Sequence, residues 1–353
     1  MEDIDPFMAY LNSRVRGMRS RLFTREQYEQ LLDADGTTGI SDQLLASPYQ
    51  HEMAEALTRY QGADAIEDAA SRNLVHTYER LLRVTQGLSR EVAEIFFNRW
   101  DLIAVKSLLR HRHHGLDADS GEGALVPGPT LSVALLNEFS SQSTMDALVR
   151  SLVGWNAALC KGLLAVLPEY NESNDVRVLE DRLDRDYFVK NTRALKDATD
   201  ESSALLRTTL QMEIDRINVR TVLGARDSDE VSEHLFARLL PGGLLHRSSL
   251  EQMAQAKSPE QVIEILGTSR YREVHRGLVQ LIHANRLSPM ERLFEHVFIR
   301  ELGRLSRTHV LSIAILLHYT WLKYNEVINL RVIARGGANH LPKGRVREEI
   351  LYA

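Results

Sequence analysis

The residues best able to support chemistry include three aspartates in the segment LEDRLDRDYF: Asp181, Asp184 and Asp186. Aspartates grouped on one helix can hold Mg²⁺ and through it a diphosphate, as in the all-α prenyl-chain synthases. Here, however, two arginines lie between the aspartates, and no second aspartate-rich helix follows. We therefore expect an amphipathic helix anchored by Leu183 and Tyr187, and we rank a magnesium-dependent synthase as a minor alternative.

A second candidate for chemistry is the histidine-rich segment RHRHHG, which contains His111, His113 and His114. Two arginines alternate with these histidines and Gly115 follows, which is typical of the last turn of a helix, where the helix dipole favours cations. We expect a solvated helix end and not a metal site. The single cysteine, Cys160, excludes an intrachain disulfide and favours a reducing compartment.

No other pattern indicates an enzyme. The sequence contains no phosphate-binding glycine loop, no nucleophile elbow and no context for a reactive cysteine. We therefore expect no catalytic residue, no cofactor and no metal ion. The formal net charge of −5 argues against nucleic acid as a partner.

The elements that carry these residues are predicted to be helices throughout. Of 353 residues, 44% are hydrophobic, and most segments show apolar residues at three- and four-residue spacing. Alternating strand patterns are scarce. The first residues show no pattern of a signal peptide, so we expect no targeting segment there. The two most apolar stretches, 148–167 and 310–322, are interrupted by charge or too short, so we expect no membrane-spanning helix. The fold class is therefore predicted to be all-α.

One helix pattern occurs three times, as WDLIAVKSLLR (100–110), IDRINVRTVLG (214–224) and NEVINLRVIAR (325–335). Each copy places an acid five residues before a base, and the acid–base pairs are Asp101 with Lys106, Asp215 with Arg220, and Glu326 with Arg331. Further matches share the period: LVPG at 125–128 with LLPG at 239–242, and Leu74 and Tyr78 with Leu183 and Tyr187, then with Leu293 and Val297. We predict three similar helical units, residues 1–115, 116–228 and 229–353.

The five-residue spacing separates each acid from its base by roughly 140° around a helix, so the two do not form the usual surface pair. One of them could face a neighbouring unit while the other faces a partner. Alternatively, both lie solvated beside a buried aliphatic stripe. The sequence leaves both readings open.

Motifs along the whole chain resemble one family, the C subunit of the archaeal and bacterial V/A-type ATP synthases, whose eukaryotic counterpart is the d subunit of the vacuolar ATPase. The resemblance is carried by YLNSRVRGMRSRL (10–22), LDRDYF (183–188), MEIDRINVRTVL (212–223), GGLL (242–245), LGTSRY (266–271) and NEVINLRVIARGGANHLPKGRVREEIL (325–351). One departure is Ala104, where the family helix usually carries asparagine, as Asn218 and Asn329 do.

The resemblance implies a non-catalytic coupling protein in which three similar helical domains form a pseudo-threefold funnel. Such a protein is peripheral, on the cytoplasmic face of the membrane, and present once per complex. It would join the rotor shaft, a coiled-coil subunit with a small globular companion, to the membrane rotor ring and transmit torque for proton or sodium transport. The alternative is a general α-helical scaffold not linked to a membrane, although its repeat would be longer than the common helical-pair repeats.

The predicted partner-binding residues are all basic: Arg14, Arg16, Lys106, Arg220 and Arg331. They could contact acidic loops or the carbonyl ends of helices in a partner. Alternatively, they hold the units of the chain to one another.

Overall fold

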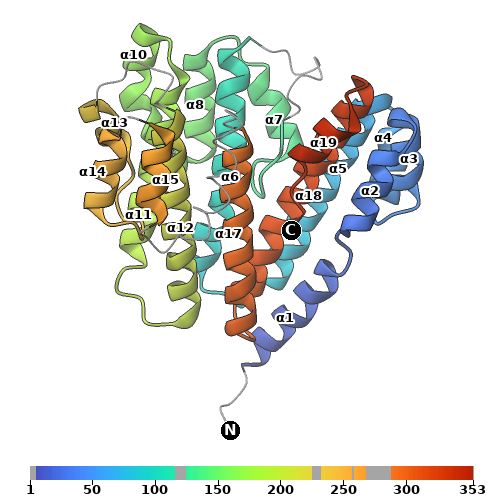
Figure 1. Ribbon diagram of the computed structural model, residues 1–353, viewed down its shortest axis with the longest axis horizontal. Coiled ribbons are helices and arrows are strands. Elements are labelled where there is room, and N and C mark those ends of the chain that lie inside the picture. Colours follow the sequence, from blue (N-terminus) through green and yellow to red (C-terminus); the bar gives the residue numbers. More distant parts are fainter. Residues whose placement is uncertain (1–4, 116–124, 225–231, 257, 268–287, 353) are drawn as a thin grey trace. The chain divides into compact units, whose positions relative to one another are not determined.

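A computed structural model describes residues 5–115, 125–224, 232–256, 258–267 and 288–352. These residues form helices and contain no strand, so the predicted all-α class is confirmed (Figure 1). No helix in these ranges combines the length and the apolarity that crossing a bilayer requires.

The chain divides into two compact units, which are described separately. The first comprises residues 1–187 and 319–352, and the second comprises residues 188–318. Both boundaries fall inside long helices, α11 (Val176–Ala194) and α18 (Ala314–Ala338). This division does not test the three predicted units of about 115 residues, which stay a prediction.

The first unit contains a group of short helices at its N-terminal end, two long helices, a second group of short helices, and the C-terminal segment. In addition to the first part of α11 and most of α18, its helices are α1 (Pro6–Arg19), α2 (Arg25–Asp33), α3 (Gly36–Leu45), α4 (Gln50–Ala56), α5 (Gly62–Val84), α6 (Arg90–His113), α7 (Val133–Ser140), α8 (Met145–Trp155), α9 (Ala157–Cys160), α10 (Leu163–Ser173) and α19 (Lys343–Glu349).

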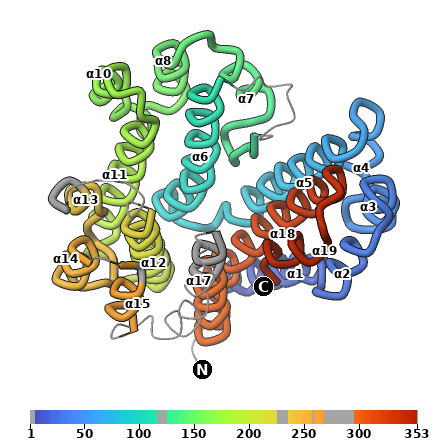
Figure 2. Tube along the Cα trace, turned by 45° about the horizontal axis from the view of Figure 1, so that its top comes forward, coloured from blue at the N-terminus to red at the C-terminus, as the bar shows by residue number. Residues whose placement is uncertain are grey.

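Helices α5 and α18 come from opposite ends of the chain and lie side by side, as both views show (Figures 1 and 2). A buried aromatic group joins α6 to α18: the ring of Trp100 lies 5.1 Å from that of Trp321 and 5.1 Å from that of Tyr324. Burial of large aromatic surfaces of this kind contributes strongly to helix packing.

The second unit is built in a similar order, with short helices between long ones. Besides the end of α11 and the beginning of α18, its helices are α12 (Glu201–Gly224), α13 (Ser232–Arg238), α14 (Arg247–Gln255), α15 (Pro259–Gly267) and α17 (Ser288–Thr308). Buried aliphatic residues of α12, α14 and α15 form its core, among them Val222, Met253 and Ile263.

Of three short helices, α2, α7 and α14, the first two begin with a side-chain N-cap, and the third does not. Thr24 caps α2 in a capping box with Gln27, and the Ser132 hydroxyl accepts a hydrogen bond from Leu135 N at the start of α7. His246 occupies the same position before α14 with extended backbone angles. N-caps with a side-chain acceptor satisfy amide groups that have no partner within the helix.

Candidate functional site

The acid of the first repeated helix, Asp101 on α6, is fully buried and holds a loop. Its carboxylate accepts hydrogen bonds from Thr130 N (3.0 Å), Thr130 Oγ1 (2.7 Å) and Leu131 N (3.0 Å). A Cβ atom added to Gly128 would collide with this carboxylate, so glycine permits the close approach of the loop. Burial raises the pKa of Asp101 above its usual range, and the three hydrogen bonds offset part of that rise.

The acid of the second repeated helix, Asp215 on α12, holds its own downstream loop at the same separation. It accepts hydrogen bonds from Leu244 N (2.9 Å) and Leu245 N (3.1 Å), which lie 29 and 30 positions further along, as Thr130 and Leu131 do for Asp101. Here Gly243 lies against the carboxylate, and a Cβ atom would again collide with it. We call each such buried acid and the backbone amides that it binds an acid clasp.

The acid of the third repeated helix, Glu326 on α18, binds a segment from the opposite end of the chain. Its carboxylate accepts hydrogen bonds from Phe23 N (2.6 Å), the Tyr49 hydroxyl (2.7 Å) and Lys323 Nζ (2.8 Å). Phe23 directly precedes the N-cap Thr24, just as Leu131 precedes Ser132 and Leu245 precedes His246. The third acid clasp therefore holds the equivalent residue of the N-terminal group of helices.

In two of the three helices, an asparagine three residues after the acid forms two further hydrogen bonds with a downstream backbone residue. The Asn218 side chain donates to Leu240 O (2.9 Å) and accepts from Leu240 N (2.7 Å). Asn329 does the same with Leu351 O (2.9 Å) and Leu351 N (3.1 Å). In both cases the backbone partner lies 22 positions downstream. Ala104, which departs from this pattern, has no polar side chain to offer.

Two of the three repeated bases also make internal contacts. Lys106 Nζ donates to Asp184 Oδ2 at 2.6 Å, which joins α6 to α11 within the first unit. Arg331 donates to Ser71 Oγ on α5 at 3.0 Å. Its Nε is buried, and burial lowers the pKa of the guanidinium. These contacts favour the reading in which the bases stabilise the chain itself.

The other predicted partner-binding residues are more accessible. Arg14 and Arg16 are exposed on α1, and Arg220 is half-buried on α12. No ion pair of these three arginines occurs among the described residues. Whether they contact a partner stays a prediction.

The aspartate-rich segment on α11 is used for packing. Asp184 binds Lys106, the neighbouring Glu180 accepts from Arg110 (3.1 Å), and Asp186 accepts from Arg182 (2.8 Å). The Arg182–Asp186 pair leaves no space for a Cβ atom at Gly162. Within the described ranges, no group of three or more histidine, cysteine, aspartate or glutamate residues is placed to hold a metal ion.

The expectation of a solvated histidine-rich helix end was wrong for one residue. His114 is exposed and His113 is half-buried, where its Nδ1 lies 3.2 Å from the Tyr170 hydroxyl. His111, by contrast, is buried. It follows the buried Ala104 and Leu108 at helical spacing and therefore lies on the core face of α6.

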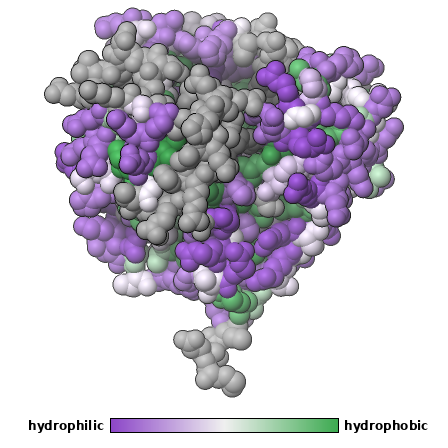
Figure 3. Space-filling model, in the orientation of Figure 1, coloured by the Kyte–Doolittle hydropathy of each residue, from purple (hydrophilic) through white to green (hydrophobic). Residues whose placement is uncertain are grey.

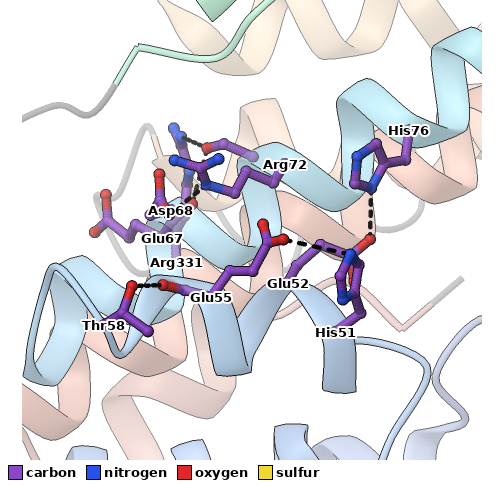
Figure 4. A network of polar contacts seen from close by, with 10 residues as sticks. His51, Glu52, Glu55, Thr58, Glu67, Asp68, Arg72, His76 and Arg331 are labelled. Carbon is purple, nitrogen blue, oxygen red and sulfur yellow. Dashed lines mark hydrogen bonds and ion pairs between the residues drawn. The ribbon is translucent and has the colours of Figure 1, made fainter.

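Polar contacts on α4 and α5 surround the Arg331 contact (Figure 4). Glu52 is buried and lies 2.8 Å from His76 Nδ1, and Asp68 accepts from Arg72 at 2.6 Å. One turn further along α18, Arg335 donates to the buried Glu67 at 2.6 Å. Burial alone would raise the pKa of Glu52, but the hydrogen bonds from His76 and Asn73 outweigh it and lower the pKa. Of these pairs, Arg335–Glu67 joins α18 to α5, and Glu52–His76 joins α4 to α5.

Sequence reasoning singled out the three acids but assigned the function to the bases. The signal that it missed was the glycine pair, because Gly128 and Gly243 each follow an acid at a separation that fits an acid clasp. Gly128 ends the LVPG segment and Gly243 directly follows the LLPG segment, and both segments were recognised as repeat markers. The Phe23–Glu326 contact had no comparable local signal.

Comparison with known proteins places this arrangement in a family context. The profile of the family described as "ATP synthase (C/AC39) subunit" matches residues 11–349. Relatives identified as the C subunit of A-type ATP synthases include one from Methanococcoides burtonii, 26% identical over 344 residues that cover 97% of this chain and 94% of the relative. Another from Haloquadratum walsbyi is 26% identical over 97% of both chains, and one from Haloferax volcanii gives the same figures.

Proposed function

The chain belongs to the ATP synthase (C/AC39) subunit family, and from this premise we propose that it is the coupling subunit of the central stalk of a rotary ATP synthase. Membership of the family makes the chain a structural, non-catalytic and peripheral part of a membrane-bound ATP synthase. The proposed role is narrower: the chain forms a socket for the rotor shaft on the membrane ring and transmits torque for proton or sodium transport. It would act as one copy per complex on the cytoplasmic face.

The observation that carries this role is the set of three acid clasps. A torque-transmitting part must resist deformation. Each acid clasp fixes the residue before the N-cap of a short helix to a long helix, through buried or partly buried hydrogen bonds to backbone amides. Hydrogen bonds with a charged acceptor are stronger than neutral ones, and they are costly to break when water cannot replace them. Their recurrence supports three similar units, at residues 1–115, 116–228 and 229–353, arranged as a pseudo-threefold funnel.

The predicted basic set separates into two proposed roles. Lys106 and Arg331 stabilise the chain through Asp184 and Ser71. The accessible arginines Arg14, Arg16 and Arg220 face partners. A general scaffold without a membrane complex has no observation in its favour.

Size-exclusion chromatography of the purified chain, mixed with the detergent-solubilised rotor ring or with the shaft pair, tests this proposal. Co-elution with both, without ATP hydrolysis by the chain alone, is the expected result. A folded, monomeric chain that binds neither would refute the coupling role.

Charge reversal separates the two proposed roles of the basic residues. Arg220→Glu is expected to weaken binding to ring or shaft while the chain keeps its melting temperature. Lys106→Glu is expected to lower the melting temperature, because it places a second carboxylate beside Asp184. If Arg220→Glu lowered the melting temperature and Lys106→Glu weakened only the binding, Arg220 would stabilise the chain and Lys106 would contact a partner.

A further inference from the structure

Helix α1 carries an unusual concentration of positive charge for this chain. Residues 6–25 include five arginines and no acidic residue, although the chain as a whole has a formal net charge of −5. The nearest acidic residue before the helix, Asp5, caps it by accepting from Phe7 N at 2.9 Å. The C-terminal half of α1 and the residues that directly follow it are therefore cationic.

The buried and exposed sides of α1 are clearly separated. Leu11, Asn12 and Val15 are buried, while Tyr10, Arg14 and Arg16 are exposed. At about 100° per residue, the three exposed residues lie within an arc of roughly 160° on the side opposite the buried ones. Tyr10 leaves 52% of its surface exposed. In Figure 3 the surface over the region of α1 is mostly hydrophilic, with apolar residues close to the N-terminal end.

The exposed face is held in place by the first unit. Helix α1 packs against α5, and the ring of Phe7 fills the space that a side chain at Gly87 would need. Arg21, just after α1, and Arg80 of α5 both act electrostatically on the phenol of Tyr319. The C-terminal part of α5 thus adds Arg80 to the cationic surface. The same part of α5 also contains the exposed Arg83 and a single acid, Glu79.

We propose that this surface, formed by Tyr10, Arg14, Arg16 and Arg21 with the end of α5, binds the anionic head groups of phospholipids. Guanidinium groups pair with phosphate through two parallel hydrogen bonds, and tyrosine is favoured at the boundary between membrane and water. Neither Arg14, Arg16 nor Arg21 forms an ion pair within the described residues, so their charge is available. A predominantly cationic face suits a lipid surface better than a protein contact, which usually mixes both signs to fix its register.

This inference rests on the proposed function, because only a protein seated on a membrane rotor would bring α1 to lipid. It assigns Arg14 and Arg16 to the bilayer in place of a protein partner, and it leaves the contact with ring and shaft to other surfaces, such as that of Arg220. The bound lipid would help to keep the chain on the rotor axis while the rotor turns.

Vesicle flotation with the full chain tests the proposal. The chain is expected to float with vesicles of equimolar phosphatidylcholine and phosphatidylglycerol. It is expected to remain at the bottom of the gradient with vesicles of phosphatidylcholine alone, and added salt should release it from the anionic vesicles. Because the chain is acidic overall, its net charge would oppose this binding. The triple variant Arg14→Gln, Arg16→Gln, Arg21→Gln should lower the partition coefficient roughly fivefold per arginine, roughly a hundredfold in total.

A charge-matched control replaces three exposed arginines elsewhere in the first unit, Arg59→Gln, Arg150→Gln and Arg345→Gln, and should leave vesicle binding unchanged. Circular dichroism confirms that both variants are folded. Failure of the folded wild-type chain to float with the anionic vesicles, or an equal loss in both triple variants, overturns the lipid proposal.

The proposed function is tested separately with rotor rings in discs that contain only phosphatidylcholine. Ring binding without vesicle binding would refute the lipid contact and leave the coupling role standing. If the α1 variant lost ring binding in these neutral discs, an acidic protein surface would be the partner of α1, and the lipid proposal would again be wrong.

Discussion

Asn329 binds both polar groups of the Leu351 backbone, donating to its carbonyl oxygen and accepting from its amide. Asn218 binds Leu240 in the same way, again 22 positions downstream. The same pair of hydrogen bonds at the same separation shows that two long helices, α12 and α18, bind their downstream segments in the same way. The acid three residues earlier adds a second contact in each helix: Asp215 also binds downstream backbone, whereas Glu326 binds Phe23 near the N-terminus.

Replacement of either asparagine by alanine should destabilise the chain. Asn218→Ala leaves the buried amide and carbonyl of Leu240 without a partner, which costs about 2 to 4 kcal/mol. Asn329→Ala is expected to cost less, about 1 to 3 kcal/mol, because Asn325 still donates to the Leu351 carbonyl at 2.9 Å and only the Leu351 amide loses its partner. Chemical denaturation measures the loss, and amide exchange should accelerate at Leu240 or Leu351 respectively. Asn137 is exposed, so Asn137→Ala serves as a control. An equally small effect in all three variants would show that the contacts of Asn218 and Asn329 with the backbone do not stabilise the chain.

The first repeated helix offers the converse experiment. Ala104 is buried at the position of the asparagines, and Val126 lies 22 positions further along. Ala104→Asn is expected to bind the Val126 backbone, to slow its amide exchange, and to raise the free energy of unfolding by about 1 kcal/mol. Faster exchange with a loss of stability would show that the larger side chain is overpacked there and that the first helix has no room for this contact.

The sequence was sufficient to predict the helical class and the repeated helix, because both depend on local spacing of apolar residues. It also located the acids and bases of the repeat. The groups that the acids bind could not be predicted from the sequence. The amides of Leu131 and Leu245 belong to loops, and almost every residue type has a backbone amide, so the sequence does not indicate which amide an acid binds. The partner of Glu326 lies 303 positions away, and no spacing within the α18 pattern indicates Phe23.

The same physics explains why the contacts of the three bases could not be predicted as a group. A base repeated at one helix position suggests one shared role. However, Lys106 donates to a carboxylate, Arg331 donates to a serine hydroxyl, and Arg220 is half-exposed. These partners depend on which helix packs alongside, and that is a tertiary property. By contrast, the acids share one role because each binds backbone, which every neighbouring segment provides.

Two glycines should be sensitive to the smallest possible substitution. Gly128→Ala and Gly243→Ala place a methyl group where the carboxylates of Asp101 and Asp215 lie, so each is expected to cost about 1 to 3 kcal/mol. Gly154→Ala provides a control of opposite sign: nothing lies within 4 Å of the added atom, and alanine should stabilise helix α8 by up to about 1 kcal/mol. Thermal unfolding of the three variants measures both effects. Equal behaviour of all three would exclude the close loop approach.

Asp101 should make the stability of the chain depend on pH in a defined direction. Because burial raises its pKa in the folded state, the folded chain binds more protons than the unfolded chain between the ordinary aspartate pKa and the raised value. Its contribution to stability is therefore largest below that window and is lost as pH rises through it, with a slope of at most about 1.4 kcal/mol per pH unit. The free energy of unfolding of the wild type relative to Asp101→Asn should fall across the window and level off above it.

Asp200 gives the matched case with the opposite sign. The Ser203 amide donates to its carboxylate at 2.9 Å, and this bond is the main cause that lowers the pKa of Asp200. Its contribution is present above the ordinary aspartate pKa and is lost as pH falls through the lowered value. Urea unfolding of the wild type, Asp101→Asn and Asp200→Asn across the acidic range should therefore give two difference curves of opposite slope. A flat curve for Asp101→Asn would mean that its hydrogen bonds from Thr130 and Leu131 fully compensate its burial.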